Sequence, residues 1–220
     1  MPSYLSLRTV FSTLKKHYDP PRTFLNYKTP FQLLVATILS AQCTDAMVNK
    51  VTKILFAKYK TSKDFVKLTQ AELQKLIKST GFFRIKSRNV LALSHILLQE
   101  YGGKVPQTME ELIKLPGVGR KTAAIILYAA FQKNEGIAVD THVMRLAERL
   151  GLTKHRDPKK IELDLMEGLP KEKWGELTTL FISHGRAVCT ARNRQCEKCV
   201  FQRDCPSSLV MGRKDHAKIS

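Results

Sequence analysis

The stretch Leu115–Lys121, which reads LPGVGRK, decides the fold in the middle of the chain. Thr108 stands ahead of it with Glu111 three residues further on. This capping-box spacing predicts a helix from Thr108 to Leu115. Pro116 and two glycines end that helix, and a second helix is predicted from about residue 120. The packed face of the second helix is predicted to hold Ala123, Ala124, Leu127, Ala130 and Phe131. The sequence thus predicts a helical hairpin.

The turn of this hairpin is suited to a phosphate contact. Gly117 and Gly119 lack Cβ, so both can adopt positive φ and bring backbone N–H groups to a phosphate at a helix N-terminus. Such a contact reads a nucleic-acid backbone and not its bases. An ordinary helix-turn-helix corner is the alternative. A nucleotide-binding P-loop is excluded, because Leu115 and Arg120 stand at its two glycine positions and a helix precedes the turn.

The net charge favours a polyanionic partner. The chain has 37 Lys and Arg against 19 Asp and Glu, a formal net charge of +18, and the basic residues recur along its whole length. Such a field attracts nucleic acid by releasing counterions. A basic surface without such a partner, or attraction to an anionic membrane, is the alternative interpretation.

The apolar residues recur mostly at helical spacing, as in Val48, Val51, Ile54 and Leu55, and no run shows sustained two-residue alternation. The pattern predicts an all-α protein. The longest apolar runs fall short of the roughly 20 residues that span a bilayer. The first residues lack the apolar core of a signal peptide. We therefore expect neither export nor a membrane partner.

Lys121 and Asp140 are the candidates for chemistry. A nucleophilic amine must be neutral, and the positive end of the second helix, the neighbouring Arg120 and partial burial would each disfavour the ammonium form of Lys121. The alternative for Lys121 is a phosphate contact. Asp140 lies in the run VDTH before a predicted helix, so it is expected to be an N-cap with a fixed orientation. His142 is expected to pack or hydrogen-bond in the first turn.

Four of the five cysteines have the spacing C-x6-C-x2-C-x5-C, which is compact enough for one metal centre. Four thiolates suit structural zinc or an iron–sulfur cluster, and the spacing leaves both open. The basic residues between them predict that the loop also meets phosphate, against the alternative of solvated charge. The four ligands are Cys189, Cys196, Cys199 and Cys205, and the basic residues are Arg192, Arg194, Lys198 and Arg203.

Three motifs in this order resemble the endonuclease III family of helix-hairpin-helix DNA glycosylases: LPGVGRKTA, VDTH and the cysteine spacing. The resemblance covers about Pro20 to Cys205 and includes the run LSAQ that ends at Gln42 and the run GFF around Phe82. It implies a two-lobed all-α fold. A six-helix barrel lobe would span residues 22–134, with the helix-hairpin-helix at about 108–131. An iron–sulfur cluster lobe would combine residues 1–21 and 135–211, and residues 212–220 would form a basic tail.

The resemblance implies a base excision repair enzyme, a bifunctional DNA N-glycosylase and AP lyase. It would remove oxidised or otherwise damaged pyrimidines and cleave the abasic site by β-elimination. Lys121 matches the nucleophile that forms a Schiff base, and Asp140 the catalytic carboxylate. The four cysteines match the ligands of a [4Fe–4S] cluster. Gln42 and Phe82 match positions that fill the gap left by a flipped nucleotide. The expected DNA-binding residues are Gln42, Phe82, Leu115, Gly117, Val118, Gly119, Arg120 and His142.

Two other functions fit parts of this pattern. Mismatch glycosylases that remove adenine or thymine carry the same cysteine cluster but generally lack lysine at the position of Lys121. A non-enzymatic helix-hairpin-helix module would leave Lys121 and Asp140 unexplained. The expected partner is double-stranded DNA with a damaged base or an abasic site. We also expect a monomer that is cytoplasmic and nucleoid-associated if the source is prokaryotic. Cys43 replaces the alanine expected after Gln42.

Overall fold

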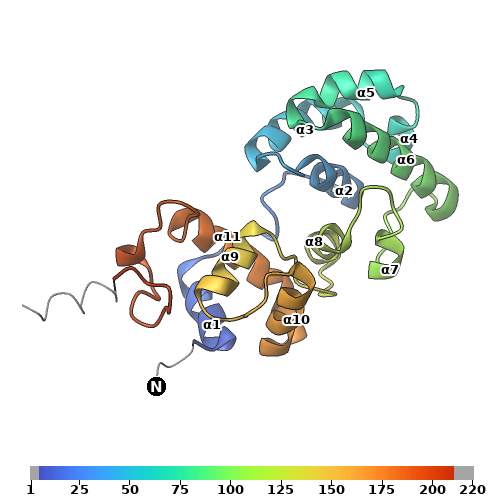
Figure 1. Ribbon diagram of the computed structural model, residues 1–220. Coiled ribbons are helices and arrows are strands. Elements are labelled where there is room, and N and C mark those ends of the chain that lie inside the picture. Colours follow the sequence, from blue (N-terminus) through green and yellow to red (C-terminus); the bar gives the residue numbers. More distant parts are fainter. Residues whose placement is uncertain (1–4, 211–220) are drawn as a thin grey trace, which may run out of the picture. The chain divides into compact units, whose positions relative to one another are not determined.

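The computed structural model describes residues 5–210, and the predicted basic tail at 212–220 lies outside them (Figure 1). The described part contains helices and no strand, which confirms the all-α class. The chain divides into two compact units. The first, here called the hairpin unit, is Thr23–Lys133. The second, the cysteine unit, joins the N-terminal residues up to Arg22 to the chain from Asn134 onwards. Each boundary differs by one residue from the expected 22–134.

The hairpin unit is built around one buried helix. Every residue of α2 from Phe31 to Leu39 is buried, and α2 contacts α3, α6 and α8. A helix that is apolar on all sides must be covered by other helices. The helices of this unit are α2 (Pro30–Leu39), α3 (Asp45–Lys58), α4 (Ser62–Phe65), α5 (Gln70–Ile77), α6 (Phe83–Tyr101), α7 (Met109–Leu112) and α8 (Arg120–Phe131), with the 3₁₀ helix η1 (Lys78–Thr80).

Threonine side chains start several of these helices. The hydroxyls of Thr29, Thr44, Thr69 and Thr108 each accept the N–H of the residue three positions on, as an N-cap does. At α5 the cap is reciprocal, because the Glu72 carboxylate accepts the Thr69 N–H at 2.8 Å. Local sequence therefore fixes where these helices begin.

The cysteine unit combines the two ends of the chain. Its helices are α1 (Leu7–His17), α9 (Thr141–Arg149), α10 (Pro158–Gly168) and α11 (Trp174–Ala187), with 3₁₀ helices η2 (Lys171–Lys173) and η3 (Cys196–Lys198). Helix α1 contacts α10 and α11 and buries Leu7, Val10, Phe11 and Leu14 in the core of the unit. After α11 the chain continues mainly as turns and loops. Within residues 5–210, none of the helices has both the length and the apolar character of a bilayer-spanning segment.

We expect Leu14→Ala to lower the free energy of unfolding of the cysteine unit by about 2–5 kcal/mol, because a fully buried side chain leaves a cavity. The single tryptophan, Trp174, packs against the core of this unit, so its fluorescence during denaturation measures the change. Leu163→Ala is the matched control, since Leu163 is 63% exposed. Equal unfolding midpoints for the two variants would contradict the packing of α1 described above.

Candidate nucleic-acid interface and cysteine site

The helix before the hairpin turn is shorter than predicted. Thr108 caps α7 as expected, accepting the Glu111 N–H at 3.3 Å. The α-helix ends at Leu112 and not at Leu115. The chain continues in tighter turns, in which the Leu115 N–H donates to the Leu112 carbonyl at 3.1 Å. Pro116 explains the early end, because it has no N–H to donate to the Leu112 carbonyl and its ring would clash with that carbonyl in a continued α-helix.

The two glycines of the turn have different roles. Gly117 has φ +79°, and a Cβ there would lie 2.8 Å from Nδ2 of Asn89 on α6. It is therefore needed both for its backbone conformation and for close packing. Gly119 has φ −94° and does not use the positive φ that its lack of a side chain allows. It is the N-cap of α8, with nothing within 4 Å of the Cβ position and no side-chain cap. The N-terminus of α8 is thus sterically open.

The other residues predicted to contact DNA at the hairpin differ in how far their side chains are buried. The side chains of Leu115 and Val118 are buried, and the Val118 N–H donates to the Leu115 carbonyl at 3.1 Å. Only main-chain atoms of these two residues are suited to a ligand contact. Arg120 and Lys121 lie exposed in the first turn of α8. The expectation that burial acts on Lys121 is therefore wrong, while the positive helix end and Arg120 remain beside it.

Gln42 and Phe82 have unusual backbone conformations. Their φ angles are 51° and 47°, in the left-handed region that costs a residue with a side chain about 1–3 kcal/mol. Both are exposed, Phe82 by 61%. Among the described residues, the third with a side chain and positive φ is Gln132, which is the C-cap of α8. Strain at an exposed glutamine and an exposed aromatic residue is characteristic of functional positions.

Lys86 was not singled out by the sequence. Its side chain is buried, and Nζ donates to the carbonyls of Leu39 at 2.8 Å and Thr80 at 2.7 Å. These carbonyls lie three residues before Gln42 and two before Phe82. One lysine among 37 basic residues carries no sequence signal of burial, because the contact depends on three separate segments.

Asp140 is the N-cap of α9, as predicted. Its Oδ1 accepts the N–H groups of His142 at 2.9 Å and Val143 at 2.8 Å, which fixes the orientation of the half-buried carboxylate. His142 accepts a hydrogen bond at Nδ1 from Nη2 of Arg145 at 2.9 Å. Arg145 also donates to the Cys189 carbonyl at 3.0 Å. The first turn of α9 is therefore joined to the start of the cysteine loop.

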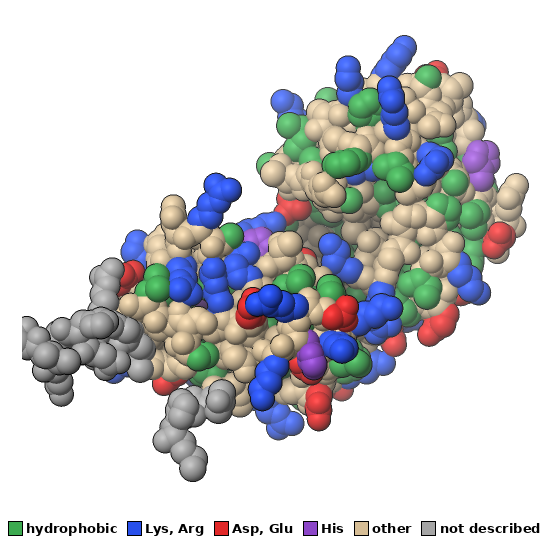
Figure 2. Space-filling view, in the orientation of Figure 1, with side chains coloured by type: hydrophobic (Ala, Val, Ile, Leu, Met, Phe, Trp, Pro, Cys, Tyr) green, Lys and Arg blue, Asp and Glu red, His purple; other side chains and the backbone are tan. Residues whose placement is uncertain are grey.

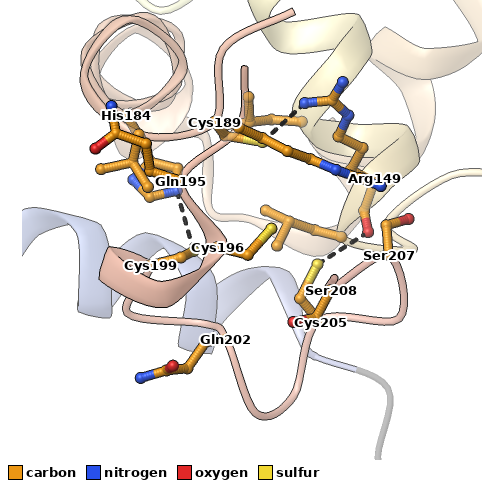
Figure 3. A pocket seen from close by; sticks show the side chains of 14 residues that line it. Arg149, His184, Cys189, Gln195, Cys196, Cys199, Gln202, Cys205, Ser207 and Ser208 are labelled. Carbon is orange, nitrogen blue, oxygen red and sulfur yellow. Dashed lines mark hydrogen bonds between the residues drawn. The ribbon is translucent and has the colours of Figure 1, made fainter. Parts of the chain in front are cut away.

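The four clustered cysteines line one pocket, as Figure 3 shows. All four are free thiols, and Cys189, Cys199 and Cys205 pack against the core of the unit. Leu146, Leu150 and Val188 make part of the wall apolar. Within residues 5–210, the side chains form no group of three or more His, Cys, Asp or Glu with the geometry to hold a single metal ion. All four thiols nevertheless line the same pocket.

Nitrogen atoms lie within hydrogen-bond distance of two of the four sulfurs, those of Cys189 and Cys199. Nη1 of Arg149 donates to Sγ of Cys189 at 3.3 Å, and the Phe201 N–H donates to Sγ of Cys199 at 3.4 Å. Nε2 of His184 lies 3.5 Å from Sγ of Cys199 (Figure 3). Such donors stabilise thiolate ligands and orient them. Burial raises the pKa of Cys199 to about 11 and also raises the pKa of Cys205, so these two groups favour the thiol until a positive centre is bound.

Basic side chains are spread over the visible face of both units in Figure 2. In the cysteine loop, Arg192, Lys198 and Arg203 are exposed, whereas Arg194 is half-buried and lines the pocket. Three of the four basic residues that the sequence associated with phosphate are thus accessible. The four thiols and Arg194 line the pocket, whereas Arg192, Lys198 and Arg203 face solvent.

Comparison with known proteins identifies the family. The model of the HhH-GPD superfamily base excision DNA repair protein matches residues 35–171. Endonuclease III of Synechocystis sp. is 50% identical over 195 residues, which cover 89% of each chain. A non-covalent endonuclease III–DNA complex superposes with a TM-score of 0.88 at 42% identity, covering 96% of this chain and 97% of that one.

A trapped endonuclease III–DNA covalent intermediate gives the same TM-score, 0.88, at 40% identity, and covers 96% of this chain and 99% of that one. Sequence and fold agree over nearly the whole length of these proteins. The matched length includes the hairpin, the capping aspartate Asp140 and the four cysteines. The chain is a member of the endonuclease III family, within the HhH-GPD superfamily of base excision DNA repair proteins.

Proposed function

We propose that this base excision repair glycosylase and AP lyase removes oxidised or otherwise damaged pyrimidines from double-stranded DNA with Lys121 as its nucleophile. The observation that carries the proposal is the exposed Lys121 in the first turn of α8, directly after an open glycine N-cap. A phosphate held at this helix end would bring a deoxyribose close to the amine. The partner we expect is duplex DNA, and a monomeric enzyme remains a prediction.

The glycosylase step replaces one bond at C1′ of the sugar by another. With the base flipped out of the helix, Nζ of Lys121 bonds to C1′ and the C1′–N bond to the base breaks. The base leaves with the electron pair of that bond and takes up a proton, and the amine loses a proton. The attack uses the lone pair of the Lys121 amine.

The lyase step follows from the same covalent link. When the sugar ring opens, the lone pair of Nζ forms a C1′=N bond as the C1′–O4′ bond breaks, which gives a protonated Schiff base. O4′ keeps the electron pair of the broken bond and takes up a proton. The Schiff base makes the 2′ proton acidic. When this proton passes to water, the C3′–O bond breaks and the 3′ phosphate leaves with its electron pair. A lysine at this position favours lyase chemistry over a mismatch adenine or thymine glycosylase.

The proposed role of Asp140 is to stabilise the sugar electrostatically while the base departs. The charge that develops on the sugar as the base departs is positive, and a carboxylate held in one orientation stabilises it without reorganising. The two cap bonds to Oδ1 hold the side chain in that orientation.

Gln42 and Phe82 would occupy the space that the flipped nucleotide leaves. An exposed amide is suited to hydrogen-bonding the orphan base, and an exposed aromatic ring is suited to wedging between bases. The strained backbone at both residues supports this role, because neither gains by burial. His142, beside the capping carboxylate, is assigned to the DNA contact on its position alone.

The cofactor we propose is a [4Fe–4S] cluster held by Cys189, Cys196, Cys199 and Cys205. The donor set fits, because four free thiols line one partly apolar pocket and N–H groups donate to two of the sulfurs. When bound, the cluster supplies a structural crosslink through four thiolates. The protein's own part is to hold the loop so that its exposed basic residues meet phosphate.

Borohydride is expected to trap a covalent adduct between the wild-type protein and duplex DNA that carries an abasic site or an oxidised pyrimidine. Lys121→Ala should form no adduct, because the Schiff base needs the amine. Lys114→Ala, which removes another exposed lysine of the hairpin segment, is the control and should trap like the wild type. The nucleophile assignment fails if Lys121→Ala traps as much DNA as Lys114→Ala.

Asp140→Asn is expected to lower the rate of base removal by about 100-fold or more, because it deletes the charge that acts on the transition state. Asparagine is also a good N-cap, so α9 should keep its stability. Asp157→Asn is the control, since Asp157 caps α10 in the same way. Single-turnover rates and circular dichroism measure both effects, and equal rates for the two variants would show that Asp140 is only a cap.

The purified protein should be brown and contain iron and inorganic sulfide. Cys199→Ser should lose iron, because Cys199 is a proposed ligand, whereas Cys43→Ser should keep it, because Cys43 lies in the other unit. Metal analysis and the visible absorbance spectrum decide the result. A colourless protein with zinc, or an iron content that Cys199→Ser leaves unchanged, would contradict the cluster.

A further inference from the structure

The buried Lys86 links the two strained turns of the hairpin unit. Leu39 is the last residue of α2 and Thr80 the last residue of η1, and both carbonyls accept hydrogen bonds from the same Nζ. The two carbonyl oxygens therefore lie no further apart than the sum of the two bond lengths. The backbone N–H of Lys86 donates to the Phe82 carbonyl at 3.1 Å. One residue thus contacts both turns.

The chemistry of these bonds explains why the residue is a lysine. The last carbonyls of a helix have no partner within the helix, and they form its negative end. An ammonium group carries several donors, so it satisfies two such carbonyls at once. Burying a lysine is costly, and burial lowers the pKa of Lys86, while the neighbouring Cys43 acts in the opposite direction. Packing alone would be served by an apolar side chain.

We propose that Lys86 is a positioning residue for DNA binding, which holds Gln42 and Phe82 in one fixed arrangement relative to each other. Gln42 follows Leu39 by three residues and has φ 51°, and Phe82 follows Thr80 by two residues and has φ 47°. Neither side chain is held by burial, so the turns themselves must be held. The inference rests on the proposed gap-filling role of these two residues.

The test compares duplex DNA that carries an abasic-site analogue with undamaged duplex of the same sequence. In the full-length holoprotein, Lys86→Met keeps most of the side-chain volume and removes the donors. We expect its preference for the abasic-site duplex, measured as the ratio of the two affinities, to fall by about tenfold or more, because small displacements of a binding group have large effects. Its lyase rate on an abasic site in single-stranded DNA should not change, since that substrate has no opposite base and no gap to fill.

A matched control separates positioning from lost stability. Leu97 is fully buried on the same helix, α6, towards its other end. Leu97→Ala should destabilise the hairpin unit and leave the preference for the abasic-site duplex at the wild-type value. Where Lys86→Met does not fold, Lys86→Gln carries the same test, because its amide keeps two donors on a shorter side chain. An intermediate preference is expected for Lys86→Gln.

A double-mutant cycle tests the link itself. If Lys86 acts through Gln42, the losses of preference caused by Lys86→Met and Gln42→Ala should not add in the double variant. Losses that add fully, or a preference in Lys86→Met equal to that in Leu97→Ala, would overturn the inference. If Gln42→Ala and Phe82→Ala both keep the wild-type preference, the gap-filling role fails instead. The two failures are therefore distinguishable.

Discussion

The burial of α2 on all sides is the constraint on which the hairpin unit depends. Because α2 has no exposed face between Phe31 and Leu39, the helices α3, α6 and α8 must pack around it. This packing places the N-terminus of α6, which follows Phe82, and the C-terminus of α2, which precedes Gln42, where Lys86 bonds to both. Helix α8, which begins with Arg120 and Lys121, packs on the same central helix. The packing around α2 thus positions the turn at Gln42, the turn at Phe82 and the start of α8, which carries Lys121.

Local sequence signals predicted much of this arrangement. The all-α class, the cap at Thr108, the start of α8 and the cap at Asp140 were confirmed, because each depends on residues within a few positions of one another. The convergence of the four thiols was also predicted, since three short spacings limit how far apart they lie. The two-lobed all-α fold was predicted from the order of LPGVGRKTA, VDTH and the four cysteines along the chain.

The features that the sequence did not predict depend on tertiary contacts. The close approach of Gly117 to Asn89 on α6 is one such feature. The early end of α7 is an exception, because the local Pro116 explains it. Lys86 was missed because its partners lie on two other segments. The donors to the cysteine sulfurs were missed for the same reason, since Arg149 belongs to α9 and His184 to α11. A spacing pattern identifies ligands but not the side chains that orient them.

The pairing of α1 with α10 and α11 has a consequence for the order in which the protein forms during synthesis. The hairpin unit is one continuous segment, so its core is complete once residue 133 has left the ribosome. The cysteine unit is discontinuous, and α1 waits for partners that are made after the whole hairpin unit. Helix α1 is therefore buried only after α10 and α11 have been translated, and the loop that carries the four cysteines follows later still.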